Sequence, residues 1–418
     1  MPEALFNLGA TLQALGRLEE ASGCFQKVLA VLIASGDQLV RDGRDAEAID
    51  FYQRALQIRP DDADVAFNLG IALHSLGRYG EAIDSYDRAL RAEPGRGETL
   101  LARALSLLTM GDFARGWREY ECRHAAKFER PRAAKQDFAF PMWRGEPLAG
   151  KRILLVGEQG YGDQVQFIRY AALLARQGAM VDVVADARLQ RLISSAPGVR
   201  KVVPEVARDA AGYDYWSLLL SLPLRLGTLL ESVPAEIPYL RPPPEEVKKW
   251  ADRLRVLPQG RPKVGLVWIA GHTGRERLHG RSMGFEPLRP LARLAGINFV
   301  GLQFGEREVK PADVAGPAEF PALQLGAEVG DFADNAALLA NLDLLVTVDT
   351  AAGHLAGALG IPAWIMLPAN PDWRWMWGRE DSPWYPGVRL LRQPTLGDWA
   401  PVVERVARDL QAFVARPA

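Results

Sequence analysis

Several features that would place this chain in a specialised class are missing from its sequence. It has two cysteines, Cys24 and Cys122, and neither has metal-ligand spacing around it, which argues against a disulfide framework or a zinc site. The formal net charge of −1 is too balanced for a general nucleic-acid or anionic-membrane binder. No apolar run approaches the ~20 residues of a membrane helix, and the first residues lack a signal-peptide pattern. These absences predict a cytoplasmic protein with reduced thiols.

The motifs of common cofactor-dependent enzymes are missing as well. No P-loop Gly-Lys-Ser/Thr is present, and the glycine-rich turn at 157–162 reads G-x-x-G-x-G rather than the G-x-G-x-x-G of dinucleotide enzymes. None of the five histidines has metal-ligand spacing. We therefore expect neither a bound metal nor a cofactor.

The first third of the chain carries an internal repeat with a period of about 34 residues. The clearest unit is 63–96, and units 29–62 and 97–130 place small and large residues at the same offsets. The repeated positions in the clearest unit are Leu69, Gly70, Leu73, Gly77, Tyr79, Ala82, Tyr86, Ala89 and Pro94. Small residues let two antiparallel helices approach closely, and a proline ends the second helix. Residues 1–130 thus resemble the tetratricopeptide repeat (TPR) family, which implies an α-solenoid.

An opening unit from Pro2 is shorter than this period, because the next unit starts too early in the sequence. We therefore expect two fused repeats with a local distortion between Val28 and Gly36. TPR arrays have concave peptide-binding surfaces, so the resemblance implies a protein or peptide partner. The alternative is an array that only supports the rest of the chain.

Residues 131–150 contain three prolines but also Phe138, Phe140 and Trp143, which predicts a docked linker rather than a free tether. A βαβ pattern follows, with a strand at 151–156, a turn containing Gly157, Gly160 and Gly162, and a helix over about 165–177. It opens a first Rossmann-like lobe, 151–241, in which 218–223 reads as another strand.

After the stiff segment Pro242-Pro243-Pro244, a second α/β lobe is predicted over 262–395. Its expected strands are 263–269, 298–303, 344–348 and 363–367, and a helix is expected over 332–341. A last helix within 396–418 is predicted to pack back on the first lobe. The fold class is thus α plus α/β.

The strongest site signal lies at 344–362, where a buried strand is followed by Asp349, Thr350 and a small-residue helix. Open α/β sheets bind ligands at the carboxyl ends of their strands, and a helix N-terminus can hold a phosphate. His354 shares a helix face with Thr350. The plainer interpretation is a capped helix with His354 packed on the sheet. Asp163, which follows the first strand of the other lobe, makes the phosphate site the better interpretation.

Several motifs then occur in one order. They are Gly157-Glu158-Gln159-Gly160-x-Gly162-Asp163, Phe332-Ala333-Asp334, Val348-Asp349-Thr350-Ala351-x-x-His354, Pro371-Asp372-Trp373-Arg374-Trp375 and Asp381-Ser382-Pro383-Trp384-Tyr385-Pro386. Together they resemble the GT-B glycosyltransferases of the ADP-heptose transferase type, family 9, and in particular their bacterial TPR-linked branch. The resemblance covers about 140–415 and implies an inverting glycosyltransferase with a nucleotide-sugar donor, of which an ADP-heptose-like sugar is one candidate.

The resemblance implies roles for individual residues. Asp163 is the expected catalytic base, although it can equally cap the helix that follows it. Thr350, Ala351, Gly353 and the N–H groups of their turn are expected to hold the diphosphate beside His354, while Asp349 is expected to orient sugar hydroxyls or to brace the turn.

Three further positions complete the predicted donor site. Arg281 is expected near the phosphates and Gln303 at the base or ribose, the alternatives being a solvated arginine and a turn residue. Trp373 and Trp375 are expected either to stack on the base or sugar or to belong to the core. The loop 271–281 departs from the family pattern.

That departure leaves a second function open, a catalytically impaired binding scaffold in which the TPR array recruits a partner. A third and weaker alternative is a sugar-nucleotide epimerase on the same fold, which would turn over a donor without an acceptor. The preferred prediction is protein glycosylation in the cytoplasm.

Overall fold

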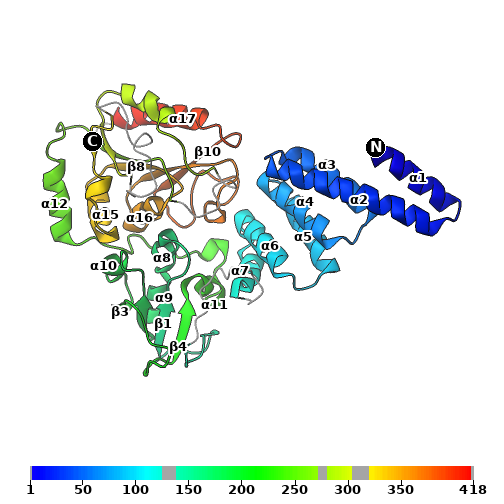
Figure 1. Cartoon of the computed structure of the whole chain (residues 1–418). Helices are drawn as coiled ribbons and strands as arrows, with labels where there is room; N and C mark the ends of the chain where they lie inside the picture. The colour runs from blue at the N-terminus through cyan, green and yellow to red at the C-terminus, as the bar shows by residue number, and fades with distance from the viewer. Residues whose placement is uncertain (1, 125–137, 272–279, 304–319, 416–418) are drawn as a thin grey trace. The chain divides into compact units, whose positions relative to one another are not determined.

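The computed structural model describes residues 2–124, 138–271, 280–303 and 320–415. The chain divides into two compact units, Met1–Pro131 and Arg132–Ala418. Figure 1 shows the helical unit in blue to cyan and the α/β unit in green to red, and the predicted loop at 271–281 lies mostly outside the described residues.

The first unit is an array of antiparallel helices. Its elements are α1 (Pro2–Ala14), α2 (Leu18–Arg41), α3 (Asp45–Ile58), α4 (Ala63–Ser75), α5 (Tyr79–Ala92), α6 (Gly97–Met110), α7 (Phe113–Tyr120) and the short η1 (Glu121–His124). Glycine permits close packing at Gly36, where an added Cβ would lie 2.7 Å from Tyr52 Cε1. The same pairing recurs between Gly70 and Tyr86, which confirms the predicted TPR geometry.

The expected fusion of the first two repeats takes the form of one continuous helix. α2 runs for 24 residues through Val28 and Gly36. The chain therefore forms neither a turn nor a break at the position where we expected a local distortion. Residues 32–35 include neither glycine nor proline, so none of them interrupts the helix.

Among the described residues, the first lobe of the second unit is a parallel sheet in the order β3-β2-β1-β4. Its strands are β1 (Arg152–Val156), β2 (Met180–Val184), β3 (Val199–Val203) and β4 (Tyr215–Leu218). Its helical segments are α8 (Tyr161–Phe167), α9 (Tyr170–Arg176), α10 (Gln190–Ile193), η2 (Leu219–Ser221), α11 (Leu222–Arg225) and η3 (Leu230–Ser232).

Two details of this lobe differ from the sequence prediction. The helix expected over 165–177 begins at Tyr161 and is divided into α8 and α9, which places Asp163 in its first turn. The strand predicted over 218–223 was wrong apart from Leu218, where β4 ends; residues 219–221 form η2, and Pro223 lies in the first turn of α11, where a proline is tolerated.

The described part of the linker is docked on this sheet. The N–H of Trp143 donates to the carbonyl of Trp216 at 2.7 Å, and the N–H of Trp216 donates to the carbonyl of Pro141 at 3.1 Å. The ring of Phe140 stacks on Tyr213, with 5.3 Å between their centroids. The apolar side chains of the linker thus cover the edge strand β4.

The second lobe is a parallel sheet in the order β10-β9-β8-β5-β6-β7 over the described residues. Its strands are β5 (Lys263–Val267), β6 (Asn298–Gly301), β7 (Leu323–Gln324), β8 (Leu344–Val348), β9 (Ala363–Leu367) and β10 (Val388–Arg392). Its helical segments are α12 (Pro244–Leu254), η4 (Glu286–Arg293), η5 (Gly326–Glu328), α15 (Phe332–Leu339), α16 (Ala351–Leu359), η6 (Trp373–Trp375) and α17 (Ala400–Val414). Every residue of β8 is buried, as its apolar sequence predicted.

The C-terminal helix packs on the second lobe rather than the first, so that prediction was wrong. Val402, Val406 and Leu410 of α17 join the apolar cluster that contains Val264 and Leu344 of the second sheet. The helix follows β10 in the chain and lies beside the second lobe (Figure 1), where the apolar stripe of α17 can be buried. No helix in the described ranges is long and apolar enough to cross a membrane.

Candidate functional site

The two lobes of the second unit meet where α8 and α16 begin. α8 follows β1 of the first sheet, and α16 follows β8 of the second sheet. Gly162 of α8 lies so close to α16 that an added Cβ would be 2.8 Å from His354 Cδ2 and 3.6 Å from Ala351 Cα. The predicted glycine-rich turn and the predicted phosphate turn are therefore neighbours in space.

The turn that leads into α8 is held by side chains of its own lobe. A Cβ on Gly157 would lie 2.6 Å from the amide carbon of Gln164, so a side chain at this position would displace the Gln164 amide. The carboxylate of Glu158 accepts a hydrogen bond from the N–H of Leu220 at 3.0 Å. Gln159 adopts a left-handed backbone with φ 60°, which is uncommon for a residue other than glycine.

Asp163 has two partners and is 9% exposed. One carboxylate oxygen accepts from the N–H of Gly160 at 2.9 Å, as a capping residue would. The other accepts from Arg374, which belongs to the second lobe. Burial raises the pKa of Asp163 above its ordinary value, and Arg374 opposes that rise. The residue predicted as a base therefore both caps α8 and forms an ion pair between the lobes.

Arg374 connects two carboxylates. Its second terminal nitrogen donates to Asp372 Oδ1 at 2.7 Å, and its guanidinium lies 4.3 Å from the centroid of Trp373. Partial burial opposes the ionisation of Asp372, but Arg374 outweighs this effect and holds the pKa of Asp372 below its ordinary value.

Asp349 lies at the end of β8 and is 4% exposed. Its Oδ1 accepts from the indole N–H of Trp375 at 2.7 Å. Its Oδ2 lies 3.7 Å from a guanidinium nitrogen of Arg281, so the predicted phosphate-site arginine does reach the end of β8. Burial raises the pKa of Asp349, and Arg281 opposes the rise.

The start of α16 carries the other predicted donor-binding residues. Thr350 precedes the helix, and its side chain makes no capping hydrogen bond; its hydroxyl pairs with that of Thr347 at 2.9 Å. Ala351 begins the helix, and the N–H of Gly353 donates to the carbonyl of Thr350 at 3.1 Å. Gly353 packs closely on the sheet, because an added Cβ would lie 2.9 Å from Ile365 Cδ1 and would displace that side chain.

His354 is buried between aromatic side chains. Its Nδ1 lies 3.0 Å from the hydroxyl of Tyr385, and its ring stacks on Trp375 at 4.7 Å between centroids. Burial, with the nearby Arg374, lowers the pKa of His354 to about 3. The imidazole is therefore neutral near pH 7 and offers no positive charge to a phosphate.

Three predicted ligand contacts are replaced by contacts within the protein. Trp373 is 4% exposed and Trp375 is 1% exposed. Both rings are therefore part of the core, as the alternative interpretation expected, and do not form an open stacking surface. Gln303 accepts from the N–H of Ile269 at 2.9 Å and donates to its carbonyl at 3.0 Å. An amide at the end of β6 thus secures the segment that follows β5, and this pairing leaves less of its hydrogen-bonding capacity for a base or ribose.

Sequence reasoning assigned no role to Arg374, Asp372, Tyr385 or Arg169. The first three lie in the two tryptophan-containing motifs at 371–375 and 381–386. The charged residues that flank the tryptophans of the first motif were the signal that could have pointed to Asp372 and Arg374. Arg169 is buried and donates to the carbonyls of Pro234 and Trp384, each at 2.8 Å. A lone arginine, which lies between α8 and α9, gave no sequence signal for this contact between the lobes.

Comparison with known proteins identifies both parts of the chain. Models of the tetratricopeptide repeat match residues 4–34, 36–77 and 63–96. A glycosyl transferase of family 9 from Veillonella parvula shares 10% identity at a TM-score of 0.50, over 65% of this chain and 99% of its own. The ADP-heptose lipopolysaccharide heptosyltransferase II of E. coli shares 19% identity at a TM-score of 0.45, over 63% and 98%.

The protein is thus a TPR array followed by a parallel α/β unit with the fold of the family 9 glycosyltransferases. Protein FlbA of Caulobacter vibrioides is 31% identical over 449 aligned residues, which cover 99% of this chain and 72% of FlbA. The chain belongs to the FlbA family.

Proposed function

We propose that this protein is an inverting glycosyltransferase that moves a sugar from a nucleotide-sugar donor to a hydroxyl of a protein acceptor. One observation carries the proposal: a buried carboxylate, Asp163, and the start of α16 come from opposite lobes and meet at one point, with Arg374 between the lobes. Glycosyl transfer needs a base for the acceptor hydroxyl and positive groups for the departing diphosphate.

Each group has a role in this proposal. Asp163 removes the acceptor proton. The N–H groups at the start of α16, together with Arg281 and Arg374, hold the diphosphate, because a helix N-terminus and guanidinium groups both favour phosphate oxygens. Asp349 accepts hydrogen bonds from sugar hydroxyls. The neutral His354 supports the turn through its contacts with Trp375 and Tyr385.

The pairing of Asp163 with Arg374 adds a step to this scheme. A carboxylate that accepts a hydrogen bond from a guanidinium is a poor base. The diphosphate of the donor would compete for Arg374, and its binding would release Asp163 to act on the acceptor. In this scheme the base becomes competent only when the donor is in place, which limits side reactions with water.

The TPR array supports a macromolecular acceptor. The helical unit presents a repeat scaffold of the kind that other proteins use to bind peptides. We therefore propose that the array recruits the acceptor and that the acceptor is a protein or peptide.

A second function is a binding scaffold without transfer. The observation that favours it is that Trp375 and Gln303, two of the expected donor contacts, already have partners within the protein. Calorimetry with UDP-, GDP-, ADP- and CMP-sugars separates the two functions, because a scaffold without a donor site binds none of them.

The direct test is a donor panel with intact-mass detection on co-expressed candidate acceptors, using wild type and Asp163→Asn. Loss of a general base lowers turnover by about 10²–10⁴-fold. Asp252→Asn is a matched control, because Asp252 forms a surface ion pair with Arg255. Wild-type turnover in Asp163→Asn would overturn the assignment of the base. Donor turnover without any acceptor would point to the epimerase.

A further inference from the structure

The first two repeats of the array share one helix, because a short segment is missing between them. In the first three repeats a glycine of the first helix contacts an aromatic ring of the second helix: Gly9 with Phe25, Gly36 with Tyr52 and Gly70 with Tyr86. Gly36 and Gly70 are separated by one full period, whereas Gly9 and Gly36 lie closer together in the sequence. The connection between the first two repeats is therefore shorter than in a complete repeat.

The missing residues correspond to the turn between repeats. Residues 59–62 separate α3 from α4, residues 93–96 separate α5 from α6, and each turn contains a proline. By the spacing from Gly9, the equivalent position is 32–35, which lies inside α2. The second helix of the first repeat consequently cannot turn back beside the first helix of the second repeat, as α3 does beside α4.

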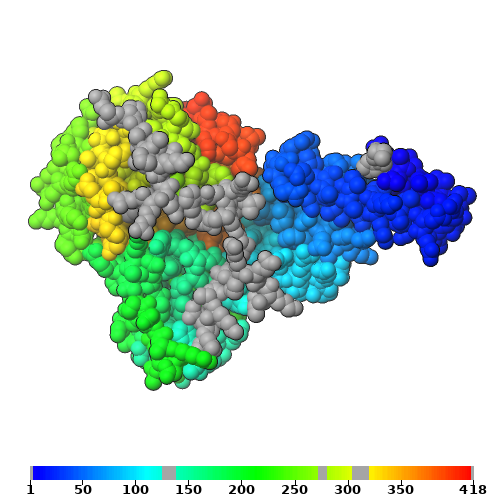
Figure 2. Space-filling view, viewed as in Figure 1, coloured from blue at the N-terminus to red at the C-terminus, as the bar shows by residue number. Residues whose placement is uncertain are grey.

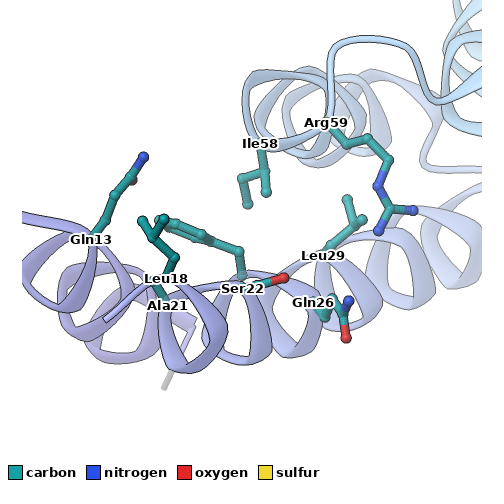
Figure 3. A pocket seen from close by; sticks show the side chains of 9 residues that line it. Gln13, Leu18, Ala21, Ser22, Gln26, Leu29, Ile58 and Arg59 are labelled. Carbon is teal, nitrogen blue, oxygen red and sulfur yellow. The ribbon is translucent and has the colours of Figure 1, made fainter. Parts of the chain in front are cut away.

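One side of α2 is left uncovered as a result. Phe25 is only half-buried, whereas its equivalents Tyr52 and Tyr86 are 1% and 0% exposed. Beside it lies a groove of about 280 Å³ between α2 and the end of α3 (Figure 3). Its lining combines apolar with polar side chains: Leu18, Ala21, Phe25, Leu29 and Ile58 with Gln13, Ser22, Gln26 and Arg59. Ala21 and Leu29 are already buried in a single copy, so Leu18 and Phe25 are the apolar side chains of α2 that a partner would cover. Figure 2 shows the outer surface of this helical part in blue.

We propose that a second copy of this chain covers the groove, with the α2 helices of the two copies lying antiparallel about a two-fold axis near Ala30. In the regular part of the array, the second helix of one repeat runs antiparallel to the first helix of the next. α2 contains both of these helices in its two halves. A second α2 in antiparallel orientation gives each half the neighbour that it lacks, and both contacts form in one symmetric interface.

Two properties of α2 favour this occupant. Its first turn carries Glu19 and Glu20, of which Glu20 pairs with Arg17 of the same chain, and its last turn carries Arg41, which donates to Gln38. In the antiparallel pair Glu19 lies beside Arg41 of the partner subunit, so these two charges are complementary. A connection too short to fold back also favours the exchange of elements between two copies. Leu18 lines the groove and is 65% exposed in a single copy, and the pairing buries apolar surface of this kind.

The test is the solution mass of the full chain by light scattering across a concentration series, with a mass of 46.0 kDa for one copy. We expect a dimer for the wild type. Leu18→Arg removes an apolar contact and places a cation beside Arg41 of the partner subunit, so it is expected to weaken dimerisation by about tenfold or more. Leu76→Arg is the matched control, because Leu76 is 42% exposed in another repeat and its substitution should leave the dimer intact.

A second variant distinguishes loss of the dimer interface from misfolding of Leu18→Arg. Insertion of a copy of segment 57–63 after Leu29 restores the regular spacing and lets the first repeat fold back within its own chain. We expect this variant to be monomeric, with helical circular dichroism retained. A monomeric wild type, equal dimerisation in Leu18→Arg and Leu76→Arg, or an insertion variant that remains dimeric would each overturn the proposal.

Discussion

Arg374 of the second lobe donates a hydrogen bond to Asp163 of the first lobe, and both side chains are about 90% buried. This contact joins residues 211 positions apart in the chain. It links the predicted base to the tryptophan-rich loop and brings opposite charges together at the junction of the lobes. The contact is therefore expected to stabilise the α/β unit and, in the proposed mechanism, to control when Asp163 can act as a base.

Removing Arg374 should destabilise the α/β unit more than removing both partners. Arg374→Ala leaves the buried Asp163 without its cation, a loss of about 3–5 kcal/mol in the free energy of unfolding. Asp163→Asn combined with Arg374→Ala should recover a substantial part of this loss. Urea unfolding of the two single variants and the double variant measures the coupling. Additive effects would contradict a direct interaction between the two side chains.

Arg281 should contribute to diphosphate binding and less to stability than Arg374 does. Its ion pair with Asp349 is long, at 3.7 Å, and the arginine side chain is 24% exposed, so Arg281→Ala should lower the free energy of unfolding by less than Arg374→Ala does, although it leaves the buried Asp349 without this cation. The dissociation constant of the Arg281→Ala variant for a nucleoside diphosphate should rise about tenfold, because a charge-assisted contact with the diphosphate is lost. Calorimetry compares this variant with Arg289→Ala, whose arginine pairs with Glu286 at the surface. Equal affinities in the two variants would remove Arg281 from the site.

His354 should make the fold less stable as the pH falls. Burial lowers the pKa of His354 to about 3 in the folded protein, whereas an unfolded histidine has a pKa near 6.5. Below about pH 6.5 the unfolded state binds the extra proton, so the free energy of unfolding falls as the pH decreases toward 3. Between pH 7 and 5 this single group accounts for about 2 kcal/mol.

The comparison with His354→Asn isolates this contribution. The variant lacks the titrating ring, so its free energy of unfolding should change less between pH 7 and 5 than that of the wild type. Only the difference in slope matters, because the substitution also changes stability at every pH. Parallel pH profiles for the two proteins would show that His354 is not buried in its neutral form.

Gly162 should tolerate no side chain. In Gly162→Ala the new Cβ would lie 2.8 Å from His354 Cδ2, so α8 and α16 must separate or His354 must move, at about 1–3 kcal/mol. Gly387→Ala is the control in the same unit, since an added Cβ meets nothing within 4 Å there. Thermal and urea unfolding of both variants tests the close approach of the lobes. Equal stability of the two variants would contradict it.

Local patterns were sufficient for much of the architecture. The spacing of glycine and tyrosine at Gly70 and Tyr86 predicted paired helices, and the structure confirms their contact. The apolar run 344–348 predicted a strand buried on both faces, and each of its residues is buried. These features depend on neighbours in the chain or on a repeated pattern, so a reader of the sequence can recognise them.

The site was predicted only in part. Arg281 lies 3.7 Å from Asp349, and Gly162 lies against the start of α16, while the predicted contact of Arg281 with a phosphate stays a prediction. The pairing of Asp163 with Arg374 was not predicted, and Trp373 and Trp375 are buried rather than free. The roles of these side chains depend on which residues from distant segments reach the same place, and a linear pattern does not contain that information.

The sequence by itself determined the repeat array, the two α/β lobes and the Asp349-Thr350 turn, because hydrophobic periodicity and glycine spacing act over short stretches of chain. The tertiary structure decided where α17 packs, that α2 passes through two repeats without a turn, and that Asp163 is held by Arg374. Burial and charge at those positions come from elements far apart in the sequence. Only the folded chain brings Gly162, His354 and Arg374 together around Asp163.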